Sequence, residues 1–462
     1  MTTRTRRSGT AIASCLAILL LIAALVAGHR RLAAYHYNVR QDVNYDFSRA
    51  QATRLQARIE DGHLDVPARA PSQHTVLLEV RIAPTLLGYW FEPHIDIESK
   101  AGHFTQALER GGAGLRYINL SGLDLQSASS IQVHGRYLKI RDQDVTLDYL
   151  PSDLDLEHQR ILVISTHPDD AEIAAYGLYE GRDAYVVTIT AGDAGDAGLF
   201  SMFAGSEAYA QKGRVRAWNS LTVPMLAGLA PDRTANLGYF DGTLCDMRAN
   251  PAQAVHALES GKDSLDAYRR ELSANLLAPH PDARATWSNL VQDLEYLITR
   301  VQPDIIATPH PLLDGYPDHQ CTTFALIQAV RNLQWKHGTL LLYSNHSPAS
   351  LQYPYGAAGE LVSLPPASGV VFDGIWSEDL SPDKQARKYL ALDAMVDLRP
   401  ELEPASLRST ASSFKHALVS RVADSDESYF RRAVRANELF FELRVPSLYE
   451  VGILQKLGDT AP

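Results

Sequence analysis

The feature that most constrains this chain is an alternation of short apolar strands with helices, which begins near residue 160. Apolar runs of this kind indicate strands that are buried on both faces, as in a parallel sheet covered by helices. The chain is therefore predicted to hold an α/β domain with a Rossmann-like, mostly parallel sheet. In chain order we expect strands at 161–164, 184–190, 304–308 and 339–343, and helices at 170–179, 290–300, 321–335, 381–395 and 428–443.

The N-terminal part follows different patterns. Residues 8–28 contain no charged residue and are long enough to cross a bilayer, which needs about 20 apolar residues in a helix. This run predicts a transmembrane anchor, with a cleaved secretory signal as the alternative. A polar stretch follows, with a helix-like run at 47–59, and is interpreted as a stalk. The short β-type runs 75–82 and 131–140 then predict a small all-β, sandwich-like domain.

Five segments result from this division of the chain. They are an anchor at 8–28, a stalk or linker at 29–72, a β-sandwich accessory domain at 73–155, a catalytic domain at 156–445 and a C-terminal tail at 446–462. The aromatic run 89–91 lies in the accessory domain, where it can pack in a core or stack on sugar rings.

Charge and cysteine content exclude some classes of function. The formal net charge is -11, from 43 basic and 54 acidic residues, and no lysine- or arginine-rich block is present. Nucleic acid is therefore not an expected partner, because its recognition depends on clustered basic residues. The three cysteines, Cys15, Cys245 and Cys321, show no metal-ligand spacing and no readable disulfide framework.

Two polar clusters follow two of the predicted strands. His167, Asp169 and Asp170 come directly after the strand at 161–164, and a second cluster ends at His319 after the strand at 304–308. In open α/β sheets ligands bind beyond the carboxyl ends of the strands. The two clusters are therefore expected to meet at the same edge of the sheet.

The residue types in these clusters suit a catalytic metal site. Such a site needs three nitrogen or oxygen ligands and an open position for water. His167, Asp170 and His319 can supply the ligands, since positions i and i+3 at a helix start face the same way. Asp169 then remains free to act as general base on the water. The alternative is a helix cap, in which Asp169 or Asp170 accepts backbone N–H bonds.

The first cluster, the run Leu237-Gly-Tyr-Phe-Asp241-Gly242 and the later Pro-Asp-His319 together resemble the PIG-L or LmbE-like de-N-acetylases, over roughly residues 159–445. The resemblance implies removal of an acetyl group from an N-acetylated amino sugar, with zinc or another divalent metal as cofactor. The residues carried over from the family motifs are His167, Asp170 and His319 as metal ligands, Asp169 as base, Asp318 as a residue orienting an imidazole, and Asp193 and Arg214 on the substrate side.

One position departs from the family pattern. Many members have a histidine where this chain has Tyr316, and a phenol is a poor proton shuttle at neutral pH because its reference pKa is about 10. Tyr316 is expected to polarise the substrate carbonyl while His310 or His346 protonates the amine. The alternative for both histidines is an ordinary surface or packing role.

These observations predict a metal-dependent hydrolase that acts on a cell-envelope glycan or glycolipid, such as lipopolysaccharide. The protein is expected to be a single-pass protein of the inner membrane, with the catalytic domain outside the cytoplasm. The alternative is a carbohydrate-binding envelope protein whose deacetylase-like domain is inactive or weakly active.

Overall fold

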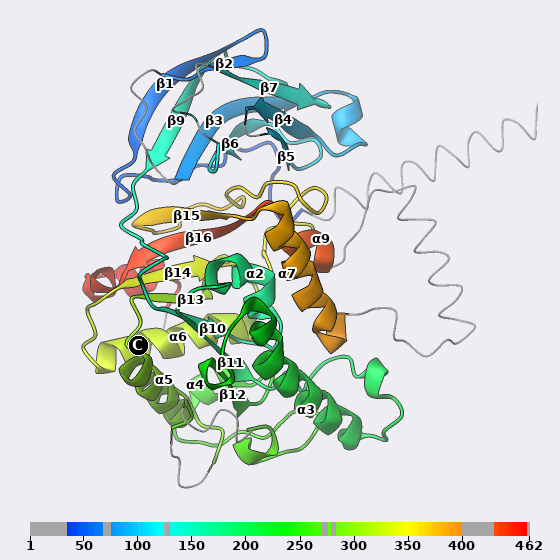
Figure 1. Ribbon diagram of the computed structural model, residues 1–462, viewed down its shortest axis with the longest axis vertical. Coiled ribbons are helices and arrows are strands. Elements are labelled where there is room, and N and C mark those ends of the chain that lie inside the picture. The colour runs from blue at the N-terminus through cyan, green and yellow to red at the C-terminus, as the bar shows by residue number, and fades with distance from the viewer. Residues whose placement is uncertain are drawn as a thin grey trace, which may run out of the picture.

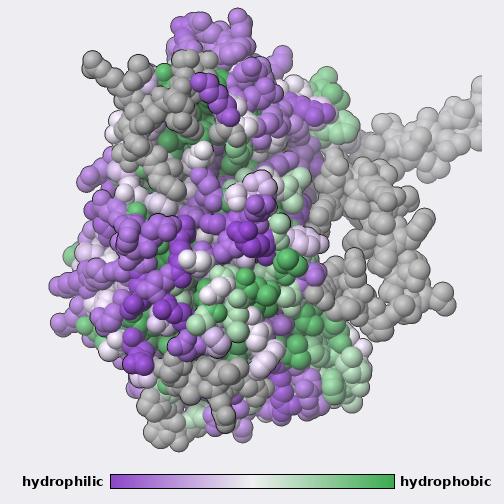
Figure 2. Space-filling model, in the orientation of Figure 1, coloured by the Kyte–Doolittle hydropathy of each residue, from purple (hydrophilic) through white to green (hydrophobic). Residues whose placement is uncertain are grey.

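The computed structural model of the protein describes residues 35–67, 75–100, 102–123, 125, 130–269, 276–278, 283–398 and 429–459. Two sheets organise these residues (Figure 1). The first third of the chain forms a nine-stranded sheet at the top of the view, and the remainder forms a seven-stranded sheet with helices on both faces. Hydrophobic residues gather on the surface over α3 and α7, whereas the nine-stranded unit is mostly hydrophilic in the same view (Figure 2).

The strands of the nine-stranded sheet pair antiparallel in the order β5-β4-β7-β2-β1-β9-β3-β6, with β8 on β3. Its side chains alternate as a half-buried sheet requires, since Ile95 and Ile97 are buried while Glu98 faces solvent. The strands are β1 Thr53–Glu60, β2 His63–Asp65, β3 Thr75–Pro84, β4 His94–Ser99, β5 Gly102–Ala107, β6 Gly114–Asn119, β7 Ser130–Arg136, β8 Leu138–Ile140 and β9 Asp144–Leu150.

Residues 53–59, expected within a helix-like stalk, lie in β1 instead. Leu55, Ala57 and Ile59 are the less exposed residues of this strand, which is a period of two rather than a helical period. The strand pairs with β9 from Thr53 to Arg58. The tertiary partner therefore decides the conformation of this polar segment.

The seven-stranded sheet has the order β12-β11-β10-β13-β14-β16-β15. The first five strands run parallel, while β16 is antiparallel to both β14 and β15. The strands are β10 Ile161–Ser165, β11 Ala184–Thr190, β12 Thr234–Tyr239, β13 Ile305–Pro309, β14 Thr339–Tyr343, β15 Gly374–Asp379 and β16 Asn437–Arg444.

Helices cover both faces of this sheet, because buried residues of α5 and α6 belong to one hydrophobic cluster and those of α2 and α7 to another. The helices are α2 Asp170–Tyr179, α3 Ser206–Thr222, α4 Leu244–Ala249, α5 Trp287–Val301, α6 Pro317–Asn332, α7 Pro382–Ala394, α9 Tyr429–Ala433 and α10 Ile453–Lys456. The elements predicted at 170–179, 184–190 and 339–343 have these bounds in the structure.

The predicted fold class is corrected by these pairings. The seven-stranded unit does not have a plain parallel Rossmann-like core, because its sheet is mixed. The helix predicted at 428–443 is also wrong, since the segment divides into α9 and β16. A central strand buried on both faces has the same apolar composition in either orientation, so a sequence pattern cannot give its direction.

The predicted transmembrane anchor, residues 8–28, lies outside the described residues. Within the described ranges no helix is both long enough and apolar enough to cross a membrane. The longest described helix, α3, has 17 residues and contains several charged side chains. The predicted transmembrane helix and the single-pass inner-membrane location therefore have no support among the described residues, and neither is carried further.

The two sheets share a hydrophobic core. Tyr45 and Phe47, which precede β1, pack with Tyr117 of β6 and with Phe372 and Phe441 of the seven-stranded unit. Residues after β16, expected as a C-terminal tail, also enter this core. Their buried members are Leu448, Ile453 and Leu457.

Candidate active site

The predicted metal ligands lie beyond the ends of two neighbouring parallel strands, β10 and β13. The chain leaves β10 at Ser165, and His167 and Asp170 follow at the start of α2. It leaves β13 at Pro309, and His319 lies in the first turn of α6. The structure thus brings together three residues that are up to 152 positions apart in the chain.

Three donor atoms form a small triangle at this edge. His167 Nδ1 lies 3.0 Å from His319 Nε2 and 3.5 Å from Asp170 Oδ2, and His319 Nε2 lies 3.1 Å from Asp170 Oδ2. Ligands bound tetrahedrally to zinc at about 2.0–2.1 Å are separated from one another by about 3.3 Å. The donor types and their separations therefore fit one face of a tetrahedral zinc site.

The carboxylate of Asp170 is held from two sides. Its Oδ2 accepts a hydrogen bond from the backbone N–H of His167 at 2.8 Å, and its Oδ1 accepts one from Asn345 Nδ2 at 2.8 Å. Asn345 follows β14 and was not selected from the sequence. These contacts direct Oδ2 toward the two imidazoles, which is the orientation a shared metal would require.

Each imidazole has a second carboxylate on its other nitrogen. His167 Nε2 lies 3.0 Å from Asp241 Oδ1, and His319 Nδ1 lies 3.0 Å from Asp314 Oδ1. Such outer partners fix the ring orientation and tautomer of a metal-binding histidine. They leave Nδ1 of His167 and Nε2 of His319 to face the triangle.

The charges of this cluster favour a cation at its centre. Burial acts to lower the pKa of His319, but the carboxylates of Asp170 and Asp314 raise it to about 10. Burial likewise acts to raise the pKa of Asp170, but His319 and His167 hold it well below its usual value. The carboxylates thus attract positive charge, whether carried by protonated imidazoles or by a metal ion.

Asp169 does not cap helix α2, because its side chain accepts no capping hydrogen bond there. Its Oδ2 instead lies 3.2 Å from Nη2 of Arg216, whose Nε lies 2.6 Å from Asp397. Burial raises the pKa of Asp169 well above its usual value, although Arg216 acts in the opposite direction. A buried carboxyl group of this kind, beside the predicted ligands, is suited to proton transfer.

The structure places Asp318 near the imidazole of His167, but the hydrogen-bond partners of its carboxylate are backbone groups. It accepts hydrogen bonds from the backbone N–H groups of Gly242 and Leu244 at 2.7 and 3.1 Å. Asp314 holds the position beside His319 that was assigned to Asp318. His167, Asp241 and Asp318 also form a group that could hold a metal ion. We favour the first triangle because its three donor atoms lie 3.0–3.5 Å apart, which is the spacing of ligands around a tetrahedral zinc ion.

Tyr316 lies over the two imidazoles and is 51% exposed. Its ring centroid is 5.6 Å from that of His319 and 6.2 Å from that of His167. His346 packs against it at 4.5 Å and lies 5.3 Å from His319. Of the two histidines proposed beside Tyr316, the structure therefore brings His346 to the site.

His310 is fully buried at the end of β13, and its Nδ1 accepts the backbone N–H groups of Leu312 and Leu313 at 3.1 and 3.3 Å. Burial lowers the pKa of His310 to about 3, which keeps the ring neutral. These contacts support the packing alternative for His310.

Two other predicted substrate residues also have structural partners. Asp193 accepts hydrogen bonds from the backbone N–H of Asp241 and from the hydroxyl of Tyr268, so it supports the loop that carries Asp241. Arg214 pairs with Glu207 on the same helix at 3.4 Å. Arg216, one half-turn further along α3, is the arginine that reaches Asp169.

A disulfide that the sequence did not reveal joins Cys245 of α4 to Cys321 of α6. Asp241 lies just before α4 and His319 lies at the start of α6. The bond therefore links the two segments that carry these site residues.

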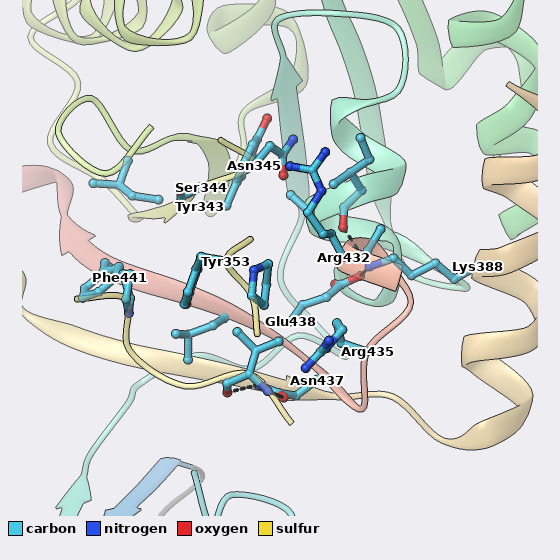
Figure 3. Close-up of a pocket in the computed structure, with 18 residues that line it drawn as sticks. Tyr343, Ser344, Asn345, Tyr353, Lys388, Arg432, Arg435, Asn437, Glu438 and Phe441 are labelled. Atoms are coloured by element: carbon cyan, nitrogen blue, oxygen red, sulfur yellow. Dashed lines mark hydrogen bonds and ion pairs between the residues drawn. The ribbon is translucent and has the colours of Figure 1, made fainter. Parts of the chain in front are cut away.

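A small cavity of about 60 Å³ lies on the other side of Asn345 (Figure 3). In it Lys388 and Glu438 point toward one another and form an ion pair at 2.7 Å. Glu438 also accepts the backbone N–H groups of Gly177 and Leu178 in α2. This buried pair fixes α2, whose first residue is Asp170, against β16 and α7.

Comparison with known families agrees with this geometry. Residues 162–330 match the family model described as PIG-L, GlcNAc-PI de-N-acetylase. This part of the chain is a PIG-L domain. The match contains the three residues of the triangle, Asp169 and Asp314, and it ends before Asn345 and His346. It supports a de-N-acetylase-like function for the PIG-L domain, without defining the substrate.

Solved structures show only weak similarity to the whole chain. A deacetylase–bog complex from the biosynthesis pathway of teicoplanin is 18% identical, with 61% of this chain and 97% of that chain covered and a TM-score of 0.27. GalB, the 4-carboxy-2-hydroxymuconate hydratase from Pseudomonas putida, is 16% identical, with coverages of 62% and 96% and a TM-score of 0.31. Similarities at these scores carry no argument about function. No curated protein matches the chain.

Proposed function

We propose that the protein is a zinc-dependent amide hydrolase that removes the acetyl group from an N-acetylated amino sugar. The observation that carries this proposal is the triangle of His167, Asp170 and His319, in which three buried donor atoms lie 3.0–3.5 Å apart. Two imidazoles and one carboxylate are a usual ligand set for catalytic zinc. The PIG-L match supports the amide bond as the bond that is broken.

A divalent cation held by the triangle would supply positive charge that polarises a carbonyl group and makes nearby water more acidic. Asp169 accepts the proton as water attacks the amide carbon, and returns it to the departing amine. Arg216 holds Oδ2 of Asp169 at 3.2 Å, so we assign the proton transfer to Oδ1. The burial that raises the pKa of Asp169 favours a carboxyl group that can hold a proton between these two steps.

Tyr316 and His346 are assigned to the substrate rather than to proton transfer. The hydroxyl of Tyr316 can donate a hydrogen bond to the oxyanion that forms when the amide carbon is attacked. Burial and the neighbouring His319 lower the pKa of His346 to about 4, so its ring is neutral at neutral pH. A neutral imidazole can orient Tyr316 or a sugar hydroxyl. Asp169 then protonates the departing amine, a role for which the family pattern offers a histidine at the position of Tyr316.

The substrate proposal is limited to the amino sugar. The argument for an envelope glycan or lipopolysaccharide depended on the predicted membrane anchor, which the described residues do not support. The acetamido group is the part of the substrate for which the site has suitable chemistry.

Acetate release from N-acetylglucosamine derivatives tests the proposal. Zinc-loaded protein should release acetate, and Asp169→Asn should lower kcat by about 10²–10⁴-fold, the usual contribution of a general acid or base, with zinc content unchanged. The control is Asp266→Asn, since Asp266 is an exposed aspartate of the short 3-10 helix Leu265–Ala267. Equal and negligible release from the wild type and Asp169→Asn across the panel would contradict hydrolysis and favour the carbohydrate-binding alternative.

A further inference from the structure

A second, larger cleft lies between the nine-stranded unit and the PIG-L side of the molecule. Its volume is about 450 Å³, within the range of small-molecule sites. One wall comes from residues 91–94 and 136–137 of the nine-stranded unit, and the other from residues 356–360 and Arg431. The cleft is thus built from both parts of the chain and is distinct from the triangle of metal-binding residues.

An aromatic surface forms part of the first wall. The rings of Phe91 and Tyr137 are stacked, with centroids 5.3 Å apart and an interplanar angle of 28°. Phe91 is 47% exposed. The guanidinium of Arg136 lies 5.2 Å from the ring centroid of Tyr137 and helps to hold it. A rigid ring presented to solvent in this way can stack on the C–H face of a pyranose.

Charged and polar groups surround the aromatic rings. Glu92 Oε1 accepts the backbone N–H of Gly356 at 3.2 Å, which joins the two walls. Glu360 Oε2 is buried and has no hydrogen-bond partner among the described residues. His94 lies edge-on to Tyr137 at 6.3 Å. Carboxylates and ring nitrogens beside an aromatic face match the alternation of hydroxyl groups and C–H faces on a sugar, rather than an apolar ligand.

Helix α9 connects this cleft to the metal-binding residues. Arg431 lines the cleft and donates hydrogen bonds to the carbonyl groups of Pro354 and Gly356. Tyr429, two residues earlier, lies 6.2 Å from the ring of His346 at the site. Residues at i and i+2 of a helix point in different directions, so one short helix contacts both places.

We infer that this cleft binds a further sugar unit of an N-acetylated oligosaccharide whose acetamido group lies at the triangle of His167, Asp170 and His319. The inference rests on the proposed deacetylase function and extends it, because it assigns an oligosaccharide rather than a single sugar as the substrate class. The cleft would then increase affinity for longer chains without taking part in the chemistry.

Binding of N-acetylglucosamine tetramer to full-length protein freed of metal by chelation tests the cleft apart from hydrolysis. Isothermal titration should show that Phe91→Ala weakens tetramer binding about tenfold, as expected for loss of one aromatic stacking contact. Zinc-loaded Phe91→Ala should show a similar increase in KM for the tetramer, with kcat for the monomer unchanged. Arg136→Gln should weaken binding less, because Arg136 holds Tyr137 and is itself exposed.

Phe203→Ala is the matched control, since Phe203 is 41% exposed and lies in the connection before α3. Phe203→Ala should leave the Kd and the KM for the tetramer unchanged. Thermal unfolding should show that each variant is folded. Tetramer binding that is absent, or equal in wild type and Phe91→Ala, would overturn the inference. Tetramer binding that depends on Phe91 without acetate release from any substrate would support the cleft while contradicting the proposed hydrolysis.

Discussion

The two connections that carry the metal-binding triangle are held in different ways. The first, residues 166–169 between β10 and α2, is short, and the backbone N–H of His167 bonds directly to Asp170. The second, residues 310–316 between β13 and α6, is longer and depends on buried polar side chains within it. His310 accepts two backbone N–H groups, and Asp314 accepts those of Tyr316, Asn345 and His346.

This difference separates two kinds of constraint on a site. In the first connection the ligand spacing follows from the local turn, and contacts from Asn345, Asp241 and Arg216 orient its side chains. In the second connection, the position of His319 depends on residues that order the loop and on a disulfide to α4. We therefore expect metal binding to be most sensitive to substitution of the ligands themselves in the first connection. In the second connection it should also be sensitive to substitution of the residues that order the loop.

The largest effect is expected when Asp170, the ligand that directly follows the first connection, loses its charge. Asp170→Asn should lower zinc affinity and kcat/KM by more than about 100-fold, the upper range for a residue that only orients a ligand. Metal analysis and acetate release measure the two quantities. Asp196→Asn, an exposed aspartate in the loop after β11, is the control and should change neither. Retention of full zinc affinity in Asp170→Asn would remove Asp170 from the ligand set.

The second connection predicts a contrast between its two aspartates. Asp314→Asn should weaken zinc binding by about 10–100-fold, because Asp314 lies 3.0 Å from Nδ1 of His319. Asp318→Asn should mainly reduce the unfolding free energy by about 1 kcal/mol, since it accepts only backbone N–H groups. Competitive chelator titration and urea unfolding distinguish the two, and the opposite order of effects on zinc affinity would restore Asp318 as the orienting residue.

Removing the disulfide tests whether the second connection needs its covalent link. The double variant Cys245→Ser, Cys321→Ser should lose about 2–5 kcal/mol of unfolding free energy, as is typical for a native disulfide. Urea unfolding with and without a reducing agent provides the measurement. Reduction should destabilise the wild type by a similar amount and leave the double variant unchanged. A wild type that is insensitive to reduction would show that hydrogen bonds alone order this connection.

A pH-dependent effect on stability is expected from the protonation of His310. Its folded pKa of about 3 lies below the ordinary value of 6.5, so unfolding takes up a proton between these limits. Stability from this residue is therefore present above pH 6.5 and is lost as pH falls, by about 2 kcal/mol between pH 7 and pH 5. His310→Asn, which keeps a hydrogen-bond acceptor, should flatten this part of the stability profile in urea unfolding. If the unfolding free energy of His310→Asn depends on pH as steeply as that of the wild type, other groups account for the pH dependence.

Sequence patterns predicted the first connection better than the second. His167 and Asp170 are three positions apart directly after a strand, and that local spacing alone places both side chains on one side of a turn. Asp314 lies five residues before His319 in a loop, and no periodic pattern indicates which aspartate of that loop turns back toward the ring. Asp241, in a third segment, was visible only as part of a family motif.

Arg216 was missed for a related reason. Both Arg214 and Arg216 lie on α3, and no sequence pattern indicates which of the two faces Asp169. The distinction depends on how the helix packs on the sheet, with Arg216 buried and Arg214 partly exposed. Buried arginines with two carboxylate partners can be recognised only after that packing is known.

By itself the sequence determined several strands and helices of the seven-stranded unit, such as 170–179, 184–190 and 339–343, and which imidazoles and carboxylates stand at their junctions. Local turn geometry and apolar runs are sufficient for that, because they act between residues close in the chain. The tertiary structure alone decided strand direction, the pairing of β1 and β16, the roles of Asp314 and Arg216, and the cleft beside Phe91. Each of these depends on contacts between distant segments, whose energies are gained only when the whole core is assembled.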